Sequence, residues 1–289
     1  MATENEIIYH RNKTIDGVNL AYREAGDASR PTIVLLGGHP SGSYAYDDLT
    51  QRLGVDWHVI APDYPGYGFS DAPADAPWTF DWLADITDGL LEQLDLERYA
   101  IYMHDFGAPV GFRIALAHPE RVAAIFTQSG NAYTDGLGPA VGFLAEWWQD
   151  KPSRQADVDN FLTLAGTRMQ WEAGAHDLES IDPAMWTLDQ ALLDRPERRA
   201  AAEALLWDYQ SNVGRYPEWQ AYLREHRPPL AAVWGKHDPF FLPQGAEAFK
   251  RDVPDAEVVL LDTGHFATVE ELDTIAEHVD KLLRRAFSA

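Results

Sequence analysis

The sequence predicts an α/β protein with a mostly parallel central sheet, flanked by helices and interrupted by an inserted α-helical segment. Short apolar runs typical of buried strands alternate with amphipathic runs typical of helices, as in a sheet covered on both faces. From about residue 133 to residue 228 only helical patterns follow one another. We therefore expect a core domain made of residues 1–132 and 229–289, and a helical cap domain at 133–228.

The first core elements can be assigned in order. Residues 7–26 alternate around an Ile-Asp-Gly turn and predict a two-stranded hairpin. The apolar run at 31–38 ends in glycines, as buried parallel strands do. Residues 57–71 predict another strand, which closes on a loop rich in Pro and Gly. An amphipathic helix at 78–96 and a strand at 98–103 continue the alternation.

The later elements repeat the pattern on both sides of the insertion. Residues 110–122 have helical spacing, and 123–130 predict a strand. The insertion consists of acidic, tryptophan-rich helical segments. Strands are then predicted within 229–239 and 256–266, and the amphipathic run at 270–287 predicts a final helix.

Composition excludes several classes of function. Lys and Arg number 23 against 46 Asp and Glu, so the net charge of −23 disfavours binding to nucleic acid or to an anionic membrane. The chain has no cysteine, which excludes disulfides, thiolate metal sites and cysteine nucleophiles. The first residues are polar, and no apolar run approaches membrane-spanning length. We expect a soluble cytoplasmic protein without a metal or cofactor.

Asp105 stands at a predicted strand-to-helix turn. Such a turn can mount a nucleophile, because it lifts one side chain clear of the sheet and directs the following N–H groups towards the atom attacked. Aspartate is also a common helix N-cap, so the turn alone leaves both interpretations open.

Other polar residues follow strand ends, where open α/β sheets bind their ligands. They lie at 37–40, after the first core strand, and at Asp238 and His265, after the last two strands. The chain order of carboxylate, acid and histidine matches the nucleophile, acid and histidine of a hydrolase triad, with Asp105 in the position of serine.

Six motifs in order resemble those of the α/β-hydrolase superfamily. They are GGHP at 37–40, PDYPGYGFSD at 62–71, HDFG at 104–107, HPERV at 118–122, WGKHDPFF at 234–241 and TGHF at 263–266. The aspartate in HDFG resembles the branch that contains epoxide hydrolases and haloalkane or haloacetate dehalogenases. The resemblance implies an α/β-hydrolase fold with a helical cap.

Roles for five residues follow from this resemblance and from chemistry. An ionised carboxylate can displace a leaving group at saturated carbon without a base, so Asp105 is expected to form an alkyl ester. His265 would activate the water that hydrolyses the ester, and Asp238 would orient the imidazole. The backbone N–H groups of His39 and Phe106 would form the oxyanion hole.

The leaving group distinguishes the possible reactions. The ring oxygen of an epoxide needs a donor, and Tyr209 is similar to the second cap tyrosine of epoxide hydrolases. Trp147 and Trp148 stand where we would look for the first cap tyrosine. With Trp207 and Tyr209 they suggest a lid over a pocket for a small apolar organic substrate. Tyr133 and Tyr216 are poorer candidates.

Several departures from the family pattern bear on the choice of substrate. Phe106 lacks the N–H of the tryptophan that binds halide in haloalkane dehalogenases. Arginines that would grip a haloacetate are missing at Phe106 and Pro109. Gly37 replaces the usual histidine of the HGxP motif, and Met103 makes the turn more crowded than in many epoxide hydrolases.

An epoxide hydrolase is therefore the leading interpretation. A haloalkane dehalogenase, an ester hydrolase with the same triad and a ligand receptor remain as alternatives. Some relatives carry the acid after the preceding strand, but this chain has only Asn131 there, so Asp238 takes that role. The oligomeric state is left open.

Overall fold

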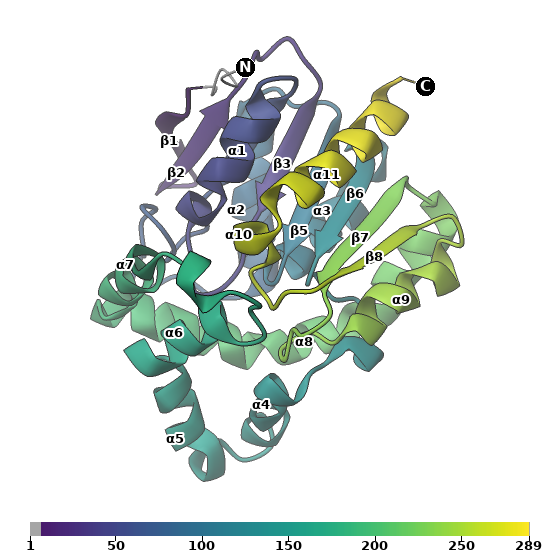
Figure 1. The fold of residues 1–289 in the computed structure, drawn as a ribbon. Coiled ribbons are helices and arrows are strands. Elements are labelled where there is room, and N and C mark those ends of the chain that lie inside the picture. The colour runs from purple at the N-terminus through teal and green to yellow at the C-terminus, as the bar shows by residue number, and fades with distance from the viewer. Residues whose placement is uncertain (1–6, 289) are drawn as a thin grey trace.

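The computed structural model describes residues 7–288, with 1–6 and 289 outside the described part. Its centre is an eight-stranded sheet in the order β1-β2-β4-β3-β5-β6-β7-β8 (Figure 1). The strands are β1 (Tyr9–Ile15), β2 (Val18–Ala25), β3 (Thr32–Leu36), β4 (His58–Pro62), β5 (Tyr99–His104), β6 (Val122–Gln128), β7 (Leu230–Gly235) and β8 (Glu257–Leu261). The predicted fold class is confirmed.

The sheet is antiparallel at one edge and parallel elsewhere. β1 and β2 form the predicted hairpin, and β2 pairs antiparallel with β4. Asp16 and Gly17 turn the hairpin with φ values of +47° and +84°, the backbone that a short hairpin loop requires. The strands from β3 to β8 are parallel, so their carboxyl ends meet at one edge.

Two helical layers cover the sheet. Ile33 and Leu35 of β3 pack in the layer that contains α1 (Asp47–Gly54) and α11 (Leu272–Phe287). Val34 and Leu36, which point the other way, pack in the opposite layer, which contains α2 (Phe80–Gln93), α3 (Gly107–Ala117) and α9 (Pro243–Asp252). The continuous apolar runs of the sequence are thus explained, because the inner strands β3 to β7 are buried on both faces.

The ends of several helices differ from their sequence patterns. α2 begins after Thr79, whose side chain accepts a hydrogen bond from the Trp82 N–H and caps the helix. α1 and α9 were not predicted, since both are short segments between stronger signals. The predicted final helix is α11, which begins two residues later than predicted, and the short α10 (Ala267–Glu270) before it was not predicted.

The segment between β6 and β7 is helical and gathers at one end of the sheet (Figure 1). We call it the helical insertion (residues 133–228). Its elements are η3 (Thr134–Gly136), η4 (Pro139–Val141), α4 (Gly142–Trp147), α5 (Lys151–Phe161), α6 (Leu164–Glu172), η5 (Leu178–Ser180), α7 (Pro183–Leu193) and α8 (Pro196–His226). It contributes no strand to the described sheet, as its sequence pattern predicts.

Two further short 3₁₀ helices lie outside the helical insertion, η1 (Ser43–Tyr46) and η2 (Pro119–Arg121). Within residues 7–288, none of the helices combines the length and the apolar character needed to cross a membrane.

Candidate active site

Asp105 occupies the turn between β5 and α3. Its backbone φ of +53° is a left-handed conformation, which costs a non-glycine residue free energy and must be enforced by its surroundings. Gly107 allows the turn to pack against β3, because a Cβ there would lie 2.0 Å from the carbonyl oxygen of Leu36. The Asp105 side chain is thereby lifted clear of the sheet at the carboxyl ends of the strands.

Two backbone N–H groups hold the Asp105 carboxylate. The His39 N–H donates to Oδ1 at 2.8 Å, and the Phe106 N–H also donates to the carboxylate. The close approach of the chain after β3 depends on Gly38, where a Cβ would lie 2.3 Å from Oδ1 of Asp105. The two amides expected to form an oxyanion hole therefore converge on one carboxyl group.

His265 and Asp238 form a buried pair beside this carboxylate. The Nδ1 atom of His265 lies 2.9 Å from Oδ2 of Asp238. Oδ1 of Asp238 accepts the N–H groups of Phe240 and Phe241 at 2.8 and 3.1 Å. Since an ionised carboxylate only accepts hydrogen bonds, Nδ1 carries the proton and Nε2 is left as the basic nitrogen. That Nε2 atom lies 3.9 Å from Oδ2 of Asp105.

Burial and charge act in opposite directions on these groups. Burial raises the pKa of Asp105 above its usual range, while His265 and the two amides partly offset the rise. Burial alone would lower the pKa of His265, but the carboxylates of Asp238 and Asp105 outweigh it and the pKa is raised. The site therefore favours an imidazole that readily takes up a proton.

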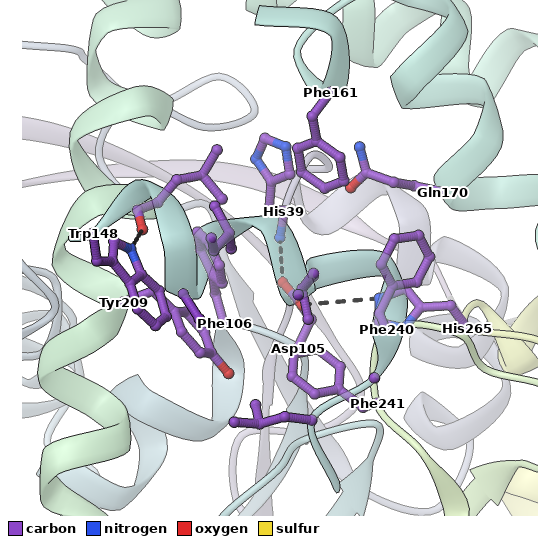
Figure 2. Close-up of a pocket in the computed structure, with 17 residues that line it drawn as sticks. His39, Asp105, Phe106, Trp148, Phe161, Gln170, Tyr209, Phe240, Phe241 and His265 are labelled. Carbon is purple, nitrogen blue, oxygen red and sulfur yellow. Dashed lines mark hydrogen bonds and ion pairs between the residues drawn. The ribbon is translucent and has the colours of Figure 1, made fainter. Parts of the chain in front are cut away.

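A cavity of about 160 Å³ adjoins the Asp105 carboxylate. Figure 2 shows Trp148 and Tyr209 on one side, His265 and Phe240 on the other, and Asp105 between them. Most of the lining is apolar and comes from the helical insertion and from the loops after β3, β5, β7 and β8. The lining residues are His39, Asp105, Phe106, Leu137, Gly138, Val141, Gly142, Leu144, Ala145, Trp148, Phe161, Gln170, Leu206, Tyr209, Phe240, Phe241 and His265.

The expected position of Trp147 in this cavity is wrong. Its side chain is fully buried elsewhere, where the indole N–H donates to Gln155 at 3.1 Å and the ring packs edge-on against Trp207. Consecutive residues of a helix point about 100° apart, so only one of the two tryptophans at the end of α4 can face the cavity. Trp148 does so, with its indole N–H donating to the Leu206 carbonyl oxygen at 3.0 Å.

Tyr209 lines the cavity from α8, as expected of a substrate-binding residue. Its hydroxyl is hydrogen-bonded to Tyr216, which in turn accepts from the Asn131 side chain at 3.2 Å. Burial raises the pKa of Tyr209 well above its usual value, so the phenol keeps its proton. Tyr133 points away and donates to Asp252 at 2.7 Å.

Phe161, Gln170 and the ring of His39 line the cavity but were not predicted to do so. Phe161 and Gln170 come from α5 and α6, where no motif distinguishes them from core residues. The His39 ring also lines the cavity, although only its backbone N–H was predicted to act. Burial lowers the pKa of His39 to about 3, so this imidazole is neutral.

One group of side chains elsewhere in residues 7–288 has the spacing of a metal site. It comprises Asp88, Glu92 and His118 on the surface of the α2 layer. The guanidinium of Arg121 already pairs with Asp88 at 3.1 Å and lies 3.8 Å from Glu92. The positive charge beside these carboxylates is thus supplied by the chain itself.

Known proteins place the chain in a family. A family model described as alpha/beta hydrolase fold matches residues 31–272. The chain belongs to this α/β hydrolase family. A relative from Saccharomyces cerevisiae, named uncharacterized hydrolase YNR064C, is 40% identical over 276 residues, which cover 94% of this chain and 95% of the relative. This α/β hydrolase shares 34% identity with a haloalkane dehalogenase of Psychrobacter cryohalolentis, over 106 residues that cover 36% of this chain and 35% of the other.

The fold also matches solved hydrolases. The epoxide hydrolase CorEH superposes with a TM-score of 0.78 at 19% identity, over 96% of this chain and 99% of that one. At this identity the likeness concerns the fold alone. The chain is thus an α/β hydrolase.

Proposed function

We propose that this α/β hydrolase acts at saturated carbon through a covalent ester on Asp105, with His265 and Asp238 completing a catalytic triad. The observation that supports this most directly is the environment of the Asp105 carboxylate. Oδ1 is held by the His39 N–H, while Oδ2 lies on the side of His265 and borders the cavity. A carboxylate in this position needs no base to become a nucleophile.

The reaction has two steps. Oδ2 of Asp105 attacks a carbon of the substrate, so a C–O bond forms while the bond from that carbon to the leaving group breaks. Water then attacks the carbonyl carbon of the ester as Nε2 of His265 removes a proton from it. The charge that develops on Oδ1 is stabilised by the N–H groups of His39 and Phe106. When the intermediate collapses, the alcohol leaves with the proton from His265 and Asp105 is regenerated.

The donors around the cavity favour an epoxide as substrate. Opening the ring creates an alkoxide on the substrate, and this oxygen needs a proton. Tyr209 is a neutral phenol that lines the cavity and is tied to the core through Tyr216 and Asn131. Its hydroxyl would transfer its proton to the alkoxide and regain one from solvent, and the product would be a vicinal diol.

A haloalkane is the second candidate substrate. The stretch of 34% identity to a haloalkane dehalogenase favours it. Against it, the N–H groups of Trp147 and Trp148 are engaged by Gln155 and Leu206, and Phe106 offers no side-chain donor. A released halide would then lack the indole donors expected at such a site. An ester hydrolase and a ligand receptor on the same fold are further alternatives, ranked below these two substrate classes.

The helical insertion would serve as a cap domain at 133–228 over a core domain at 1–132 and 229–289. It supplies Trp148, Phe161 and Tyr209 to the cavity, and these side chains form much of its apolar wall. A cavity of about 160 Å³ with so little polar lining suits a small apolar organic molecule.

The test compares two substrates with the same enzyme. The purified protein is incubated with a terminal epoxide and, separately, with a bromoalkane of similar size, and diol and bromide are measured. We expect diol formation that disappears in the Asp105→Asn variant. Bromide release without diol would make haloalkanes the substrate class. If neither diol nor bromide forms with any substrate of a broad panel, that absence would contradict a reaction at saturated carbon.

A further inference from the structure

Asp189 of α7 is a buried carboxylate that takes no part in the proposed reaction. It is 1% exposed and lies between the helical insertion and the core. Its Oδ2 atom accepts the Ser41 hydroxyl at 2.9 Å and the Trp171 indole N–H at 2.7 Å. Its Oδ1 atom accepts the Tyr44 hydroxyl. All three donors are uncharged, and two of them belong to the core.

The surroundings of Asp189 contain no compensating cation. Within residues 7–288 it has no salt bridge to any basic side chain of α6, α7, α8 or the core. The titratable groups near it are Tyr44 and Tyr46, with Asp63 close to Tyr44. Arg23 lies beyond Tyr44, 5.8 Å from the centre of that ring. Burial raises the pKa of Asp189 to about 6, while its three hydrogen bonds oppose the rise.

The three donors lead to both loops that hold the proposed catalytic groups. Ser41 and Tyr44 belong to the β3 loop (residues 37–46), which also contains His39 and its N–H to Asp105. Trp171 stacks face to face on Phe266, with ring centres 3.8 Å apart and planes 9° apart. Phe266 follows His265 in the histidine loop (residues 262–268). Asp189 is therefore connected to the His39 N–H through the β3 loop, and to His265 through Trp171 and Phe266.

We propose that Asp189 is a positioning residue whose ionised carboxylate fixes the β3 loop and the histidine loop relative to each other. Through it, the packing of the helical insertion on the core influences the alignment of Asp105 and His265. The catalytic part of this claim depends on the proposed function, whereas the anchoring of the loops does not.

Protonation explains how this anchor would respond to pH. An ionised carboxylate can accept all three hydrogen bonds, but a protonated carboxyl carries a hydrogen that must face one of the three donors. The hydroxyls of Ser41 and Tyr44 can rotate to accept that hydrogen, whereas the indole N–H of Trp171 cannot. The ionised form therefore gives the single arrangement in which all three donors are satisfied at once.

The titration of Asp189 can be followed without any substrate. In 15N-labelled protein, the indole N–H resonance of Trp171 is assigned by its loss in Trp171→Phe and then followed as pH is varied. We expect its shift to titrate with a midpoint near pH 6 and to become flat in Asp189→Asn. A resonance that does not move would overturn the response to pH, and one that still titrates in Asp189→Asn would overturn the assignment of this titration to Asp189.

Hydrogen exchange separates the two arms of the anchor. A hydrogen bond to a charged group stabilises by about 1.5 to 3 kcal/mol, which corresponds to about tenfold or more in local opening. Ser41→Ala should speed exchange in the β3 loop only, and Trp171→Phe in the histidine loop only. Asp189→Asn should speed exchange in both, whereas Asp182→Asn, which keeps an N-cap on the same helix, should change neither. Unchanged exchange in Asp189→Asn would refute the anchoring.

A kinetic comparison tests the consequence for catalysis. In a His265→Gln background, where the ester on Asp105 is expected to persist, its rate of formation is measured with and without Asp189→Asn. We expect at least a tenfold slower rate with Asp189→Asn and little change in substrate affinity, with Asp182→Asn as control. An equal rate would reject the positioning role. No ester in any variant would reject the proposed function, while hydrogen exchange still decides the anchoring.

Discussion

The Nε2 atom of His265 lies 3.9 Å from Oδ2 of Asp105, and the opposite nitrogen of the same imidazole lies 2.9 Å from Asp238. One ring thus joins a carboxylate that borders the cavity to one that is buried behind it. The gap between Nε2 and Asp105 exceeds a hydrogen bond, which leaves His265 directed at the side of the carboxyl group that an ester would occupy.

Replacing Asp238 by asparagine should slow hydrolysis of the ester more than its formation. The amide would keep an acceptor for the Phe240 and Phe241 N–H groups but could no longer stabilise the imidazolium. We expect a fall of about 10² to 10⁴-fold in turnover, with a burst of ester before the steady state. Rapid-quench measurements of ester and diol check this.

Asp262→Asn is a matched control for that variant. Asp262 pairs with His237 at 2.7 Å on the exposed surface, where an ion pair contributes little. The turnover of Asp262→Asn should stay within about twofold of that of the parent enzyme, because the pair lies outside the cavity. Equal effects of the two substitutions would mean that the pairing of Asp238 with His265 has no special role.

Tyr209→Phe should distinguish epoxides from haloalkanes. Without its hydroxyl, ring opening loses its proton donor, and ester formation from an epoxide should slow by about 10²-fold or more. Displacement of bromide from a bromoalkane should not depend on this hydroxyl. Tyr222→Phe on the same helix serves as control, since Tyr222 does not line the cavity. An unchanged rate of diol formation in Tyr209→Phe would remove Tyr209 from the mechanism.

Gly38→Ala should abolish turnover, because its Cβ would lie 2.3 Å from Oδ1 of Asp105. Either the β3 loop or the carboxylate must move, so the hydrogen bond from the His39 N–H is lost. Gly214→Ala is the control: it lies in α8 with no atom near the added Cβ, and it should stabilise the fold by about 0.5 to 1 kcal/mol. Activity assays and denaturant unfolding of both variants check this, and an active Gly38→Ala enzyme would contradict the described geometry.

The stability of the fold should depend on pH through Asp189. Its pKa rises from an ordinary 3.8 to about 6 on folding, so ionisation of Asp189 lowers the free energy of unfolding by about 3 kcal/mol relative to the protonated form. This penalty is absent below pH 3.8, grows as pH rises, and is complete above pH 6. The free energy of unfolding of Asp189→Asn relative to the parent should therefore decrease by about 1 kcal/mol between pH 7 and pH 5. Urea unfolding at both pH values measures it, and a constant difference would contradict the raised pKa.

Much of the fold and the core of the site could be predicted from local patterns. The apolar runs of β3 and β5 are continuous because both faces of the sheet are covered, and the polar residues after them stand out for that reason. Asp105, Asp238 and His265 each follow a strand of the same parallel sheet. Their proximity therefore follows from topology, without knowledge of side-chain contacts.

The contributions of the helical insertion could not be predicted in the same way. Trp147 and Trp148 are equivalent in sequence, and only the rotation of the short α4 decides which one reaches the cavity. Asp189 meets Ser41 across 148 residues, and nothing in its helical segment sets it apart from the many acidic side chains of this chain. Such contacts depend on how the insertion packs on the core, which a local pattern does not encode.

The most direct test of the proposed mechanism is mass spectrometry of the His265→Gln variant after incubation with an epoxide. With the base removed, hydrolysis stops and the ester should accumulate on the peptide that contains Asp105. The mass increment should equal the whole epoxide, because ring opening releases no atom. Diol formation by this variant without any such increment, or an increment on a different residue, would contradict a covalent ester on Asp105.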